Sequence, residues 1–167
     1  MKLVKRFDSQ FAEIVKMIHL ARYNAIKNVN TELVKLYWNI GEYISRKLES
    51  AEWGDAVVDQ LADYIQIKHP EFKGFTRRGL YRMRQFYETY RQKEIVSAVL
   101  TQIGWTNHLL ILSKTKTKEE REFYISLAIK EKYSSRELER QIDSGYYERV
   151  MLSKKKVSPV LTQKHPQ

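Results

Sequence analysis

Apolar residues recur at three- and four-residue steps along almost the whole chain, a repeat that is typical of amphipathic α-helices. Helix-breaking residues are rare: there are three prolines and six glycines in 167 residues, and the glycines fall mostly between the periodic runs. No stretch shows the long alternation of β-branched and polar residues that predicts a half-buried strand. The sequence therefore predicts an all-α, multi-helix fold.

The periodic runs predict helices at about residues 8–28, 31–48, 55–67, 77–91, 107–112, 118–132 and 135–151. Side chains that can accept hydrogen bonds from free helix amides precede these runs. The expected caps are Asp8 or Ser9, Asn30, Thr76, Thr106, Thr117 and Ser134. The apolar stretch at residues 94–103 fits a helix or an extended segment equally well.

The length of the chain suits one compact domain. We expect a helical domain over residues 1–152, with a subdivision near residues 92–104, followed by a basic linker or tail over residues 153–167. The absence of cysteine excludes disulfides, thiol catalysis and Cys-ligated zinc. No signal peptide and no apolar run of about 20 residues is present, so we expect a cytoplasmic protein with no membrane partner.

Positive charge is concentrated in parts of the chain. The formal net charge is +10, yet residues 8–67 carry −3 and residues 94–150 are neutral. Residues 68–93 carry +6, and the two terminal segments, residues 1–7 and 151–167, carry +3 and +4. Such local excess indicates a contact surface for a polyanion, whereas an even spread would indicate only solubility.

The segment at residues 77–91 places every arginine away from its apolar face when it is drawn as a helix. Arginine forks match phosphate oxygens and guanine edges, and glutamine can pair with adenine. With the helix at 55–67 in front of it, the pair resembles a helix-turn-helix whose second helix enters the major groove of double-stranded DNA. The alternative is a solvated or protein-binding face, neutralised in part by Asp55, Asp59 and Asp63.

The DNA-binding interpretation assigns contacts to one helix, to its flanks and to the tail. Arg77 and Arg84, one heptad apart, are the best candidates for groove or phosphate contacts. Phosphate contacts from tail lysines would add affinity without sequence information. The full candidate set is Lys73, Arg77, Arg78, Tyr81, Arg82, Arg84, Gln85, Arg91, Lys154, Lys155 and Lys156.

An ordered series of motifs supports a family resemblance. The motifs are Tyr37–Gly41 (YWNIG), Gly74–Tyr87 (GFTRRGLYRMRQFY), Trp105–His108 (WTNH), Ser134–Ile142 (SSRELERQI) and Tyr147–Arg149 (YER). Over about residues 10–150 the chain resembles the N-terminal domain of the bacterial YhcG-type family. The resemblance implies a helical domain with a suspected DNA-binding role, which precedes a C-terminal PD-(D/E)XK nuclease domain as its partner in the full-length protein.

The nuclease itself is not expected in this chain. Such a site needs a carboxylate and a downstream (D/E)-x-K on adjacent strands, to hold Mg²⁺ and activate water. The sequence Glu71-Phe72-Lys73 lies in a turn bounded by Pro70 and Gly74. The four histidines form no i, i+4 pair, so we expect no metal and no cofactor. Trp105 and His108 fit a packed turn in which the histidine bonds the backbone.

The sequence thus predicts a non-catalytic DNA-binding or targeting module of a YhcG-type nuclease protein, acting through the helix at 77–91. The alternative is an interaction or dimerisation module of the same family, whose basic face docks an acidic partner. A homodimer is compatible with both.

Overall fold

The computed structural model describes residues 2–92 and 96–163, and the described part contains eight α-helices and no strand. The predicted all-α fold is confirmed. The helices are α1 (Lys2–Glu49), α2 (Asp55–Lys68), α3 (Arg77–Tyr90), α4 (Val96–Leu100), α5 (Trp105–Lys114), α6 (Lys118–Glu131), α7 (Ser135–Asp143) and α8 (Tyr146–Gln163).

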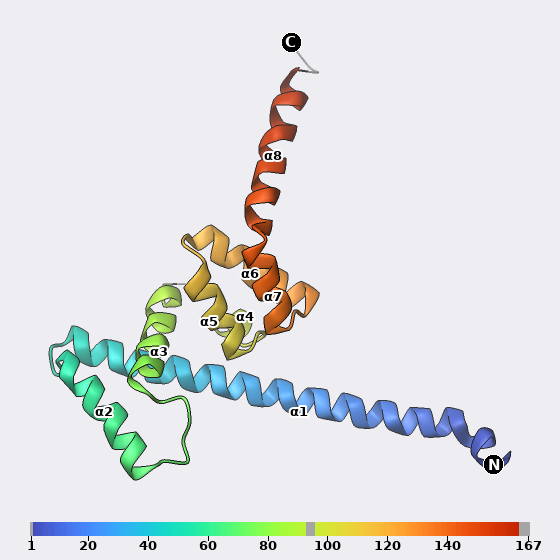
Figure 1. The fold of residues 1–167 in the computed structure, drawn as a ribbon, viewed down its shortest axis with the longest axis horizontal. Coiled ribbons are helices and arrows are strands. Elements are labelled where there is room, and N and C mark those ends of the chain that lie inside the picture. Colours follow the sequence, from blue (N-terminus) through green and yellow to red (C-terminus); the bar gives the residue numbers. More distant parts are fainter. Residues whose placement is uncertain (1, 93–95, 164–167) are drawn as a thin grey trace.

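A long helix carries the rest of the molecule (Figure 1). Helix α1 forms a rod, and α2 and α3 lie at its C-terminal end. Helices α4 to α7 form a compact group beside the rod, and α8 projects away from that group. Both the N-terminal part of α1 and the C-terminal part of α8 therefore extend into solvent from a body formed by the remaining helices.

Helix α1 is continuous over 48 residues, so the expectation of two helices separated near Asn30 was wrong. The segment between the two expected helices contains no proline or glycine, and nothing in it forces the backbone to leave the helical conformation. Thr31 Oγ1 donates to the carbonyl of Lys27, four residues earlier, as a threonine inside a helix does. Asn30 is therefore an interior residue and not a cap.

Three predicted caps are confirmed. The side-chain oxygen of Thr76 accepts from the amide of Gly79 and begins α3, and Thr117 accepts from the amide of Glu120 and begins α6. Ser134 forms a complete capping box at the start of α7, because Glu137 also accepts from the Ser134 amide.

Two other boundaries differ from the expectation. Gly104, and not Thr106, is the N-cap of α5, which extends to Lys114. The helix expected at 135–151 is split into α7 and α8 at Gly145, whose φ of +69° is a conformation that suits glycine. The stretch left open at 94–103 contains the short helix α4, with residues 93–95 outside the described part.

The C-terminal segment is more regular than expected. Its backbone is helical to Gln163, so the linker or tail expected at 153–167 begins inside α8. Residues 164–167 lie outside the described part of the chain.

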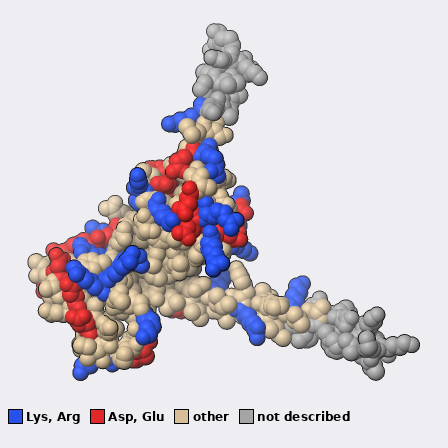
Figure 2. Space-filling view, viewed as in Figure 1, with Lys and Arg blue, Asp and Glu red and all other residues tan. Residues whose placement is uncertain are grey.

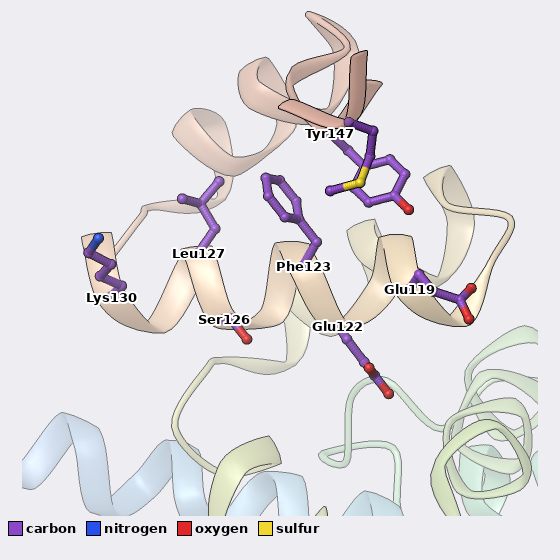
Figure 3. A pocket seen from close by; sticks show the side chains of 8 residues that line it. Glu119, Glu122, Phe123, Ser126, Leu127, Lys130 and Tyr147 are labelled. Carbon is purple, nitrogen blue, oxygen red and sulfur yellow. The ribbon is translucent and has the colours of Figure 1, made fainter. Parts of the chain in front are cut away.

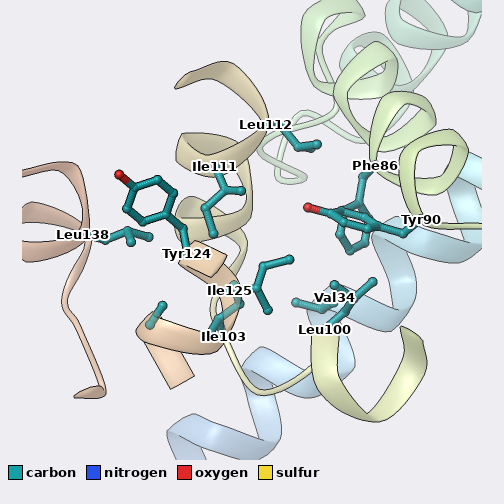
Figure 4. Packing of buried hydrophobic residues seen from close by; sticks show 11 residues of the cluster. Val34, Phe86, Tyr90, Leu100, Ile103, Ile111, Leu112, Tyr124, Ile125 and Leu138 are labelled. Atoms are coloured by element: carbon teal, nitrogen blue, oxygen red, sulfur yellow. The ribbon is translucent and has the colours of Figure 1, made fainter. Parts of the chain in front are cut away.

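Two clusters of buried side chains form the core. The larger one (Figure 4) joins α1 and α3 to α4 through α7, and its members include Val34, Phe86, Ile111, Tyr124 and Leu138. The smaller one joins the C-terminal part of α1 to α2 and α3, through Ile44, Val58, Ala62, Leu80 and Met83. Trp105 packs against both clusters, so α5 ties the two halves together.

Helix α3 lies very close to α1 at Gly41. A Cβ atom at this position would lie 2.1 Å from the carbonyl oxygen of Met83, inside any allowed contact distance. Only glycine permits this approach, which brings the backbones of α1 and α3 together. The position of α3 is thus fixed by α1 on one side and by the core on the other.

Candidate nucleic-acid interface

Helix α3 buries one face completely and turns the other outward. Leu80, Met83, Phe86 and Tyr90 are buried, as the helical wheel of the sequence predicts. These four side chains recur at three- and four-residue steps, so they share one stripe of the helix. The remaining side chains of α3 are half-buried or exposed, and all the arginines of the segment are among them.

The relation between α2 and α3 does not establish a helix-turn-helix. The two helices do share the smaller core cluster, through Val58 of α2 and Leu80 of α3. Residues 69–76 between them form a loop with no helical turn, which is longer than the three or four residues typical of that motif. Helix α3 instead approaches α1 very closely, at Gly41.

Arg77 begins α3 and is paired within the molecule. Its Nε lies 2.8 Å from Oδ1 of Asp59, in the middle of α2. Its guanidinium also lies 5.7 Å from the centre of the Tyr81 ring. Tyr81 is half-buried against the smaller core cluster, so its ring is a fixed support for this guanidinium.

Arg84 belongs to a small polar network between α3 and α1. Its Nε donates to Oε1 of Glu88 at 2.7 Å, and the hydroxyl of the fully buried Ser45 donates to the same oxygen at 2.9 Å. Burial raises the pKa of Glu88, but the hydrogen bonds from Arg84 and Ser45 outweigh it, so that this pKa lies below its ordinary value. Arg84 is therefore already paired with a carboxylate of its own chain, that of Glu88.

Arg91, the C-cap residue of α3, is also paired within the chain. Its Nη1 donates to Oε1 of Glu49, at the end of α1, and its guanidinium lies 6.0 Å from the centre of the Tyr87 ring. The hydrogen bond to Glu49 raises the pKa of Arg91. Three of the five candidate arginines, Arg77, Arg84 and Arg91, are thus paired within the chain.

Arg78, Arg82 and Gln85 are different. None of them has an ion pair or a side-chain hydrogen bond with any residue that the structure describes. Arg78 and Gln85 are exposed on the side of α3 opposite its packed stripe, and Arg82 is half-buried at the edge of that stripe. Lys73, in the loop before α3, is exposed as well. We call these four residues the outward face of α3.

The lysines of the C-terminal segment do not join this face. Lys154 and Lys155 are exposed on α8, which projects away from the body, whereas α3 lies at the other side of it (Figure 1). The side chain of Lys156 lies outside the described residues. Any contact that these lysines make with DNA would therefore be separate from the contacts of α3.

The surface around α2, α3 and the end of α1 carries both signs of charge. Figure 2 shows acidic side chains directly beside basic ones at this end of the molecule. The ion pairs of Arg77, Arg84 and Arg91 are part of this mixture. The excess of +6 over residues 68–93 thus does not become one uniform basic surface on the side shown.

The sequence identified the arginines but not which of them are free. The pair of Arg84 with Glu88 has i, i+4 spacing, a signal that the sequence contains. The hydrogen bond from Ser45 to Glu88 has no such local signal, because the two residues are 43 positions apart in the sequence.

In the described part of the chain, no three His, Asp or Glu side chains gather closely enough to hold a metal ion. Glu71 and Lys73 both lie in the loop between α2 and α3, and the Glu71 carboxylate is 3.4 Å from Nδ1 of His69. A groove of about 580 Å³ between α6 and α8 is mainly apolar, lined by Phe123, Leu127, Tyr147 and Met151, with charged residues at its rim (Figure 3).

His108 is a structural residue, as expected from its place beside Trp105. It is fully buried, and its Nε2 lies 2.6 Å from the carbonyl oxygen of Leu100. A carbonyl can only accept, so Nε2 carries the proton and Nδ1 does not. Burial lowers the pKa of His108 to about 4.

Within the described ranges, none of the helices combines the length and apolar character that crossing a bilayer needs.

Comparison with known proteins places the chain in a family. The profile of the DUF1016 N-terminal domain matches residues 13–149. A protein of Escherichia coli (strain K12) named "Putative nuclease YhcG" is 26% identical over an alignment of 186 positions, which covers 92% of this chain and 48% of that protein. The chain thus spans about half the length of this relative. No solved structure matches it. Since the profile covers most of its length, the chain belongs to the DUF1016 N-terminal domain family.

Proposed function

We propose that the chain is a non-catalytic module that binds double-stranded DNA and brings a nuclease domain to it. The observation that carries this proposal is the outward face of α3, where Arg78, Arg82 and Gln85 have no partner within the described protein. A cation held on a rigid helix without an internal partner is available to an external anion. The paired arginines, Arg77 and Arg84, become secondary candidates for contact.

The chemistry of the outward face fits a nucleic acid. Arg78 and Arg82 are one turn apart, so their guanidinium groups can bind neighbouring phosphates or the edge of a guanine. Gln85 lies two turns from Arg78 and can pair with adenine or donate to a phosphate. Lys73 extends the face along the loop. The buried stripe of α3 holds these side chains on a fixed frame, which reduces the entropy lost on binding.

The place of the chain in its family supports the targeting role. The matched family profile is that of an N-terminal domain, and the relative in E. coli is named as a nuclease. We therefore propose a C-terminal nuclease domain as the covalent partner in the full-length protein, which acts in the cytoplasm. In this arrangement the helical domain supplies affinity for DNA, and the appended domain supplies cleavage.

The experiment is a titration of a fluorescent DNA duplex with the 167-residue chain at about 50 mM and about 200 mM salt, followed by anisotropy. The double variant Arg78→Glu/Arg82→Glu should bind at least about tenfold more weakly and show a salt slope lower by about 2. The matched control is Arg136→Glu/Arg140→Glu, which makes the same charge change at exposed positions of α7. Circular dichroism checks that both variants fold.

Equal loss of affinity in the two double variants would show that net charge alone binds DNA, and would contradict the role of α3. Absence of binding by the unmodified chain at low salt would exclude the proposed function.

A further inference from the structure

Helix α1 carries an apolar stripe that is largely exposed. Ile26, Val29, Leu33, Leu36, Ile40 and Tyr43 follow one another at alternating steps of three and four residues, the spacing of a coiled-coil seam. Ile26 and Val29 are 63% and 58% exposed, and Tyr43 is 57% exposed. Further toward the N-terminus, Val15 and Ile18 continue the stripe and are about half exposed.

Apart from Ile40, which packs against the smaller core cluster, this stripe is not the face with which α1 joins its own core. The fully buried residues of α1 are Val34, Gly41, Ile44 and Ser45, and most of them lie on a side of the helix roughly a quarter-turn or more from the stripe. From residue 15 to residue 29 every side chain is exposed. Over residues 15–29 the stripe thus stays exposed with respect to the described part of its own chain, and an isolated helix gains little stability without packing.

At its C-terminal end the stripe enters a groove of about 560 Å³. Leu36, Ile40 and Tyr43 form one wall, and residues of α2 and of the loop before α3, such as Leu61 and Phe72, form the other. The groove is almost wholly apolar. A helix with an apolar face is the kind of ligand that such a groove takes.

We propose that a second copy of this chain covers the stripe, with the two α1 helices antiparallel and crossing at Val29. The stripe is self-complementary about this residue, because Val15, Ile18 and Arg22 are as far from Val29 on one side as Tyr43, Ile40 and Leu36 are on the other. In the antiparallel pair, the N-terminal arm of each copy lies along the groove of the other. The same patch is used twice, as a two-fold axis requires.

Charge favours the antiparallel direction. Arg22 is the charged residue within the stripe, and it has no ion pair with any described residue. A parallel, in-register pair would set Arg22 against Arg22. The antiparallel pair sets it against Leu36, one turn from Glu32 of the other copy, and Glu32 has only a loose contact of 3.9 Å with Lys35 in its own chain.

The stripe is long enough for several helical turns of each copy to be in contact. From residue 15 to residue 43 it is about 42 Å long, and both copies contribute one stripe and one groove. This association goes beyond the proposed DNA binding and does not depend on it, because the stripe and the outward face of α3 share no residue.

The first experiment measures the mass of the whole chain by light scattering at micromolar concentration. The expected mass is twice that of the 20.0 kDa chain. Val29→Lys places like charges across the two-fold axis and should give a monomer with unchanged helix content. The matched control is Asn28→Lys, an exposed residue on another side of the same helix, which should remain a dimer.

The second experiment tests direction and charge. The chain has no cysteine, so introduced ones can be read without background. A mixture of Ile18→Cys and Ile40→Cys chains should crosslink with each other, whereas Ile18→Cys alone should not. Arg22→Glu should weaken the dimer at least about tenfold, and Arg22→Glu/Glu32→Arg should restore it. A monomeric chain at 100 micromolar (roughly the upper end of typical assays), a dimer that survives Val29→Lys, or self-crosslinking of Ile18→Cys would each overturn the proposal.

Discussion

Arg77 Nε lies 2.8 Å from Asp59 Oδ1, and this ion pair joins the first turn of α3 to the middle of α2. It also removes one positive charge from the surface that α3 offers to a ligand. The distribution of charge over α3 is therefore set by the acids of α1 and α2 as much as by its own arginines.

Replacement of Asp59 by asparagine should release Arg77 for an external anion. If α3 binds DNA, Asp59→Asn should raise the affinity for duplex by roughly threefold to tenfold, because one more cation can meet a phosphate. The free energy of unfolding should change by less than about 1 kcal/mol, since the Arg77 side chain is 67% exposed. Anisotropy and urea titrations measure the two quantities. Asp63→Asn changes an exposed residue of the same helix that has no ion pair with any described residue, and it should raise affinity less.

Gly41→Ala should destabilise the fold strongly. The added methyl group would lie 2.1 Å from the backbone oxygen of Met83, which cannot move aside as a side chain can. We expect a loss of about 2–4 kcal/mol in the free energy of unfolding, measured by urea denaturation. Gly54→Ala is the control, because no atom lies within 4 Å of the added carbon there. A loss below about 1 kcal/mol at Gly41 would show that α1 and α3 separate easily.

The buried stripe of α3 and the caps of α3, α6 and α7 could be predicted from the sequence, because both kinds of feature depend on residues within about one turn of each other. The continuity of α1 through Asn30 could not be predicted in this way. Asn30 is a good cap by type, yet the packing of Val34, Gly41 and Ile44 and the absence of a breaking residue keep the backbone helical through it. Local preference was overridden by tertiary contacts.

The candidate site shows the same division between local and distant signals. The Arg84–Glu88 pair could be predicted from its spacing, whereas the contact of Arg77 with Asp59 and that of Arg91 with Glu49 need the positions of three helices. The charge of a segment can thus be read from the sequence, but the part of it that is free for a ligand cannot.

Stability should fall in acid because of His108. Its pKa is about 4 in the folded protein, below the ordinary 6.5, so the unfolded chain binds a proton that the folded chain excludes. The folded state is therefore favoured above pH 6.5, and this contribution is lost as the pH falls from 6.5 toward 4. We expect about 2 kcal/mol of loss between pH 7 and pH 5 from this residue.

Urea titrations across this pH range, with His108→Gln and with the exposed control His19→Gln, measure the effect. The His108 variant should lose most of this part of the pH dependence and the His19 variant should keep it. An unchanged slope in His108→Gln would assign the acid sensitivity of this pH range to other groups.

Alanine substitution can distinguish Ser134, which caps a helix, from Thr106, which only has a residue type typical of caps. Ser134→Ala removes the side chain that accepts from the Glu137 amide and should cost about 1 kcal/mol. Thr106→Ala should cost less than about 0.5 kcal/mol, because Thr106 is exposed within the first turn of α5 and Gly104 is the N-cap. Thermal unfolding of the two variants compares them directly. Equal costs would mean that Thr106 has a role in α5 other than capping.

The length of α1 has a consequence for any measurement of size in solution. At about 1.5 Å per residue, 48 residues extend for about 72 Å, far beyond a compact body of this mass. A particle of this shape experiences more friction than a sphere of equal volume, so it sediments slowly and elutes early from a gel-filtration column. The elution volume would therefore depend on the length of α1 more than on the number of chains. The number of chains has to come from a method that measures mass, such as light scattering.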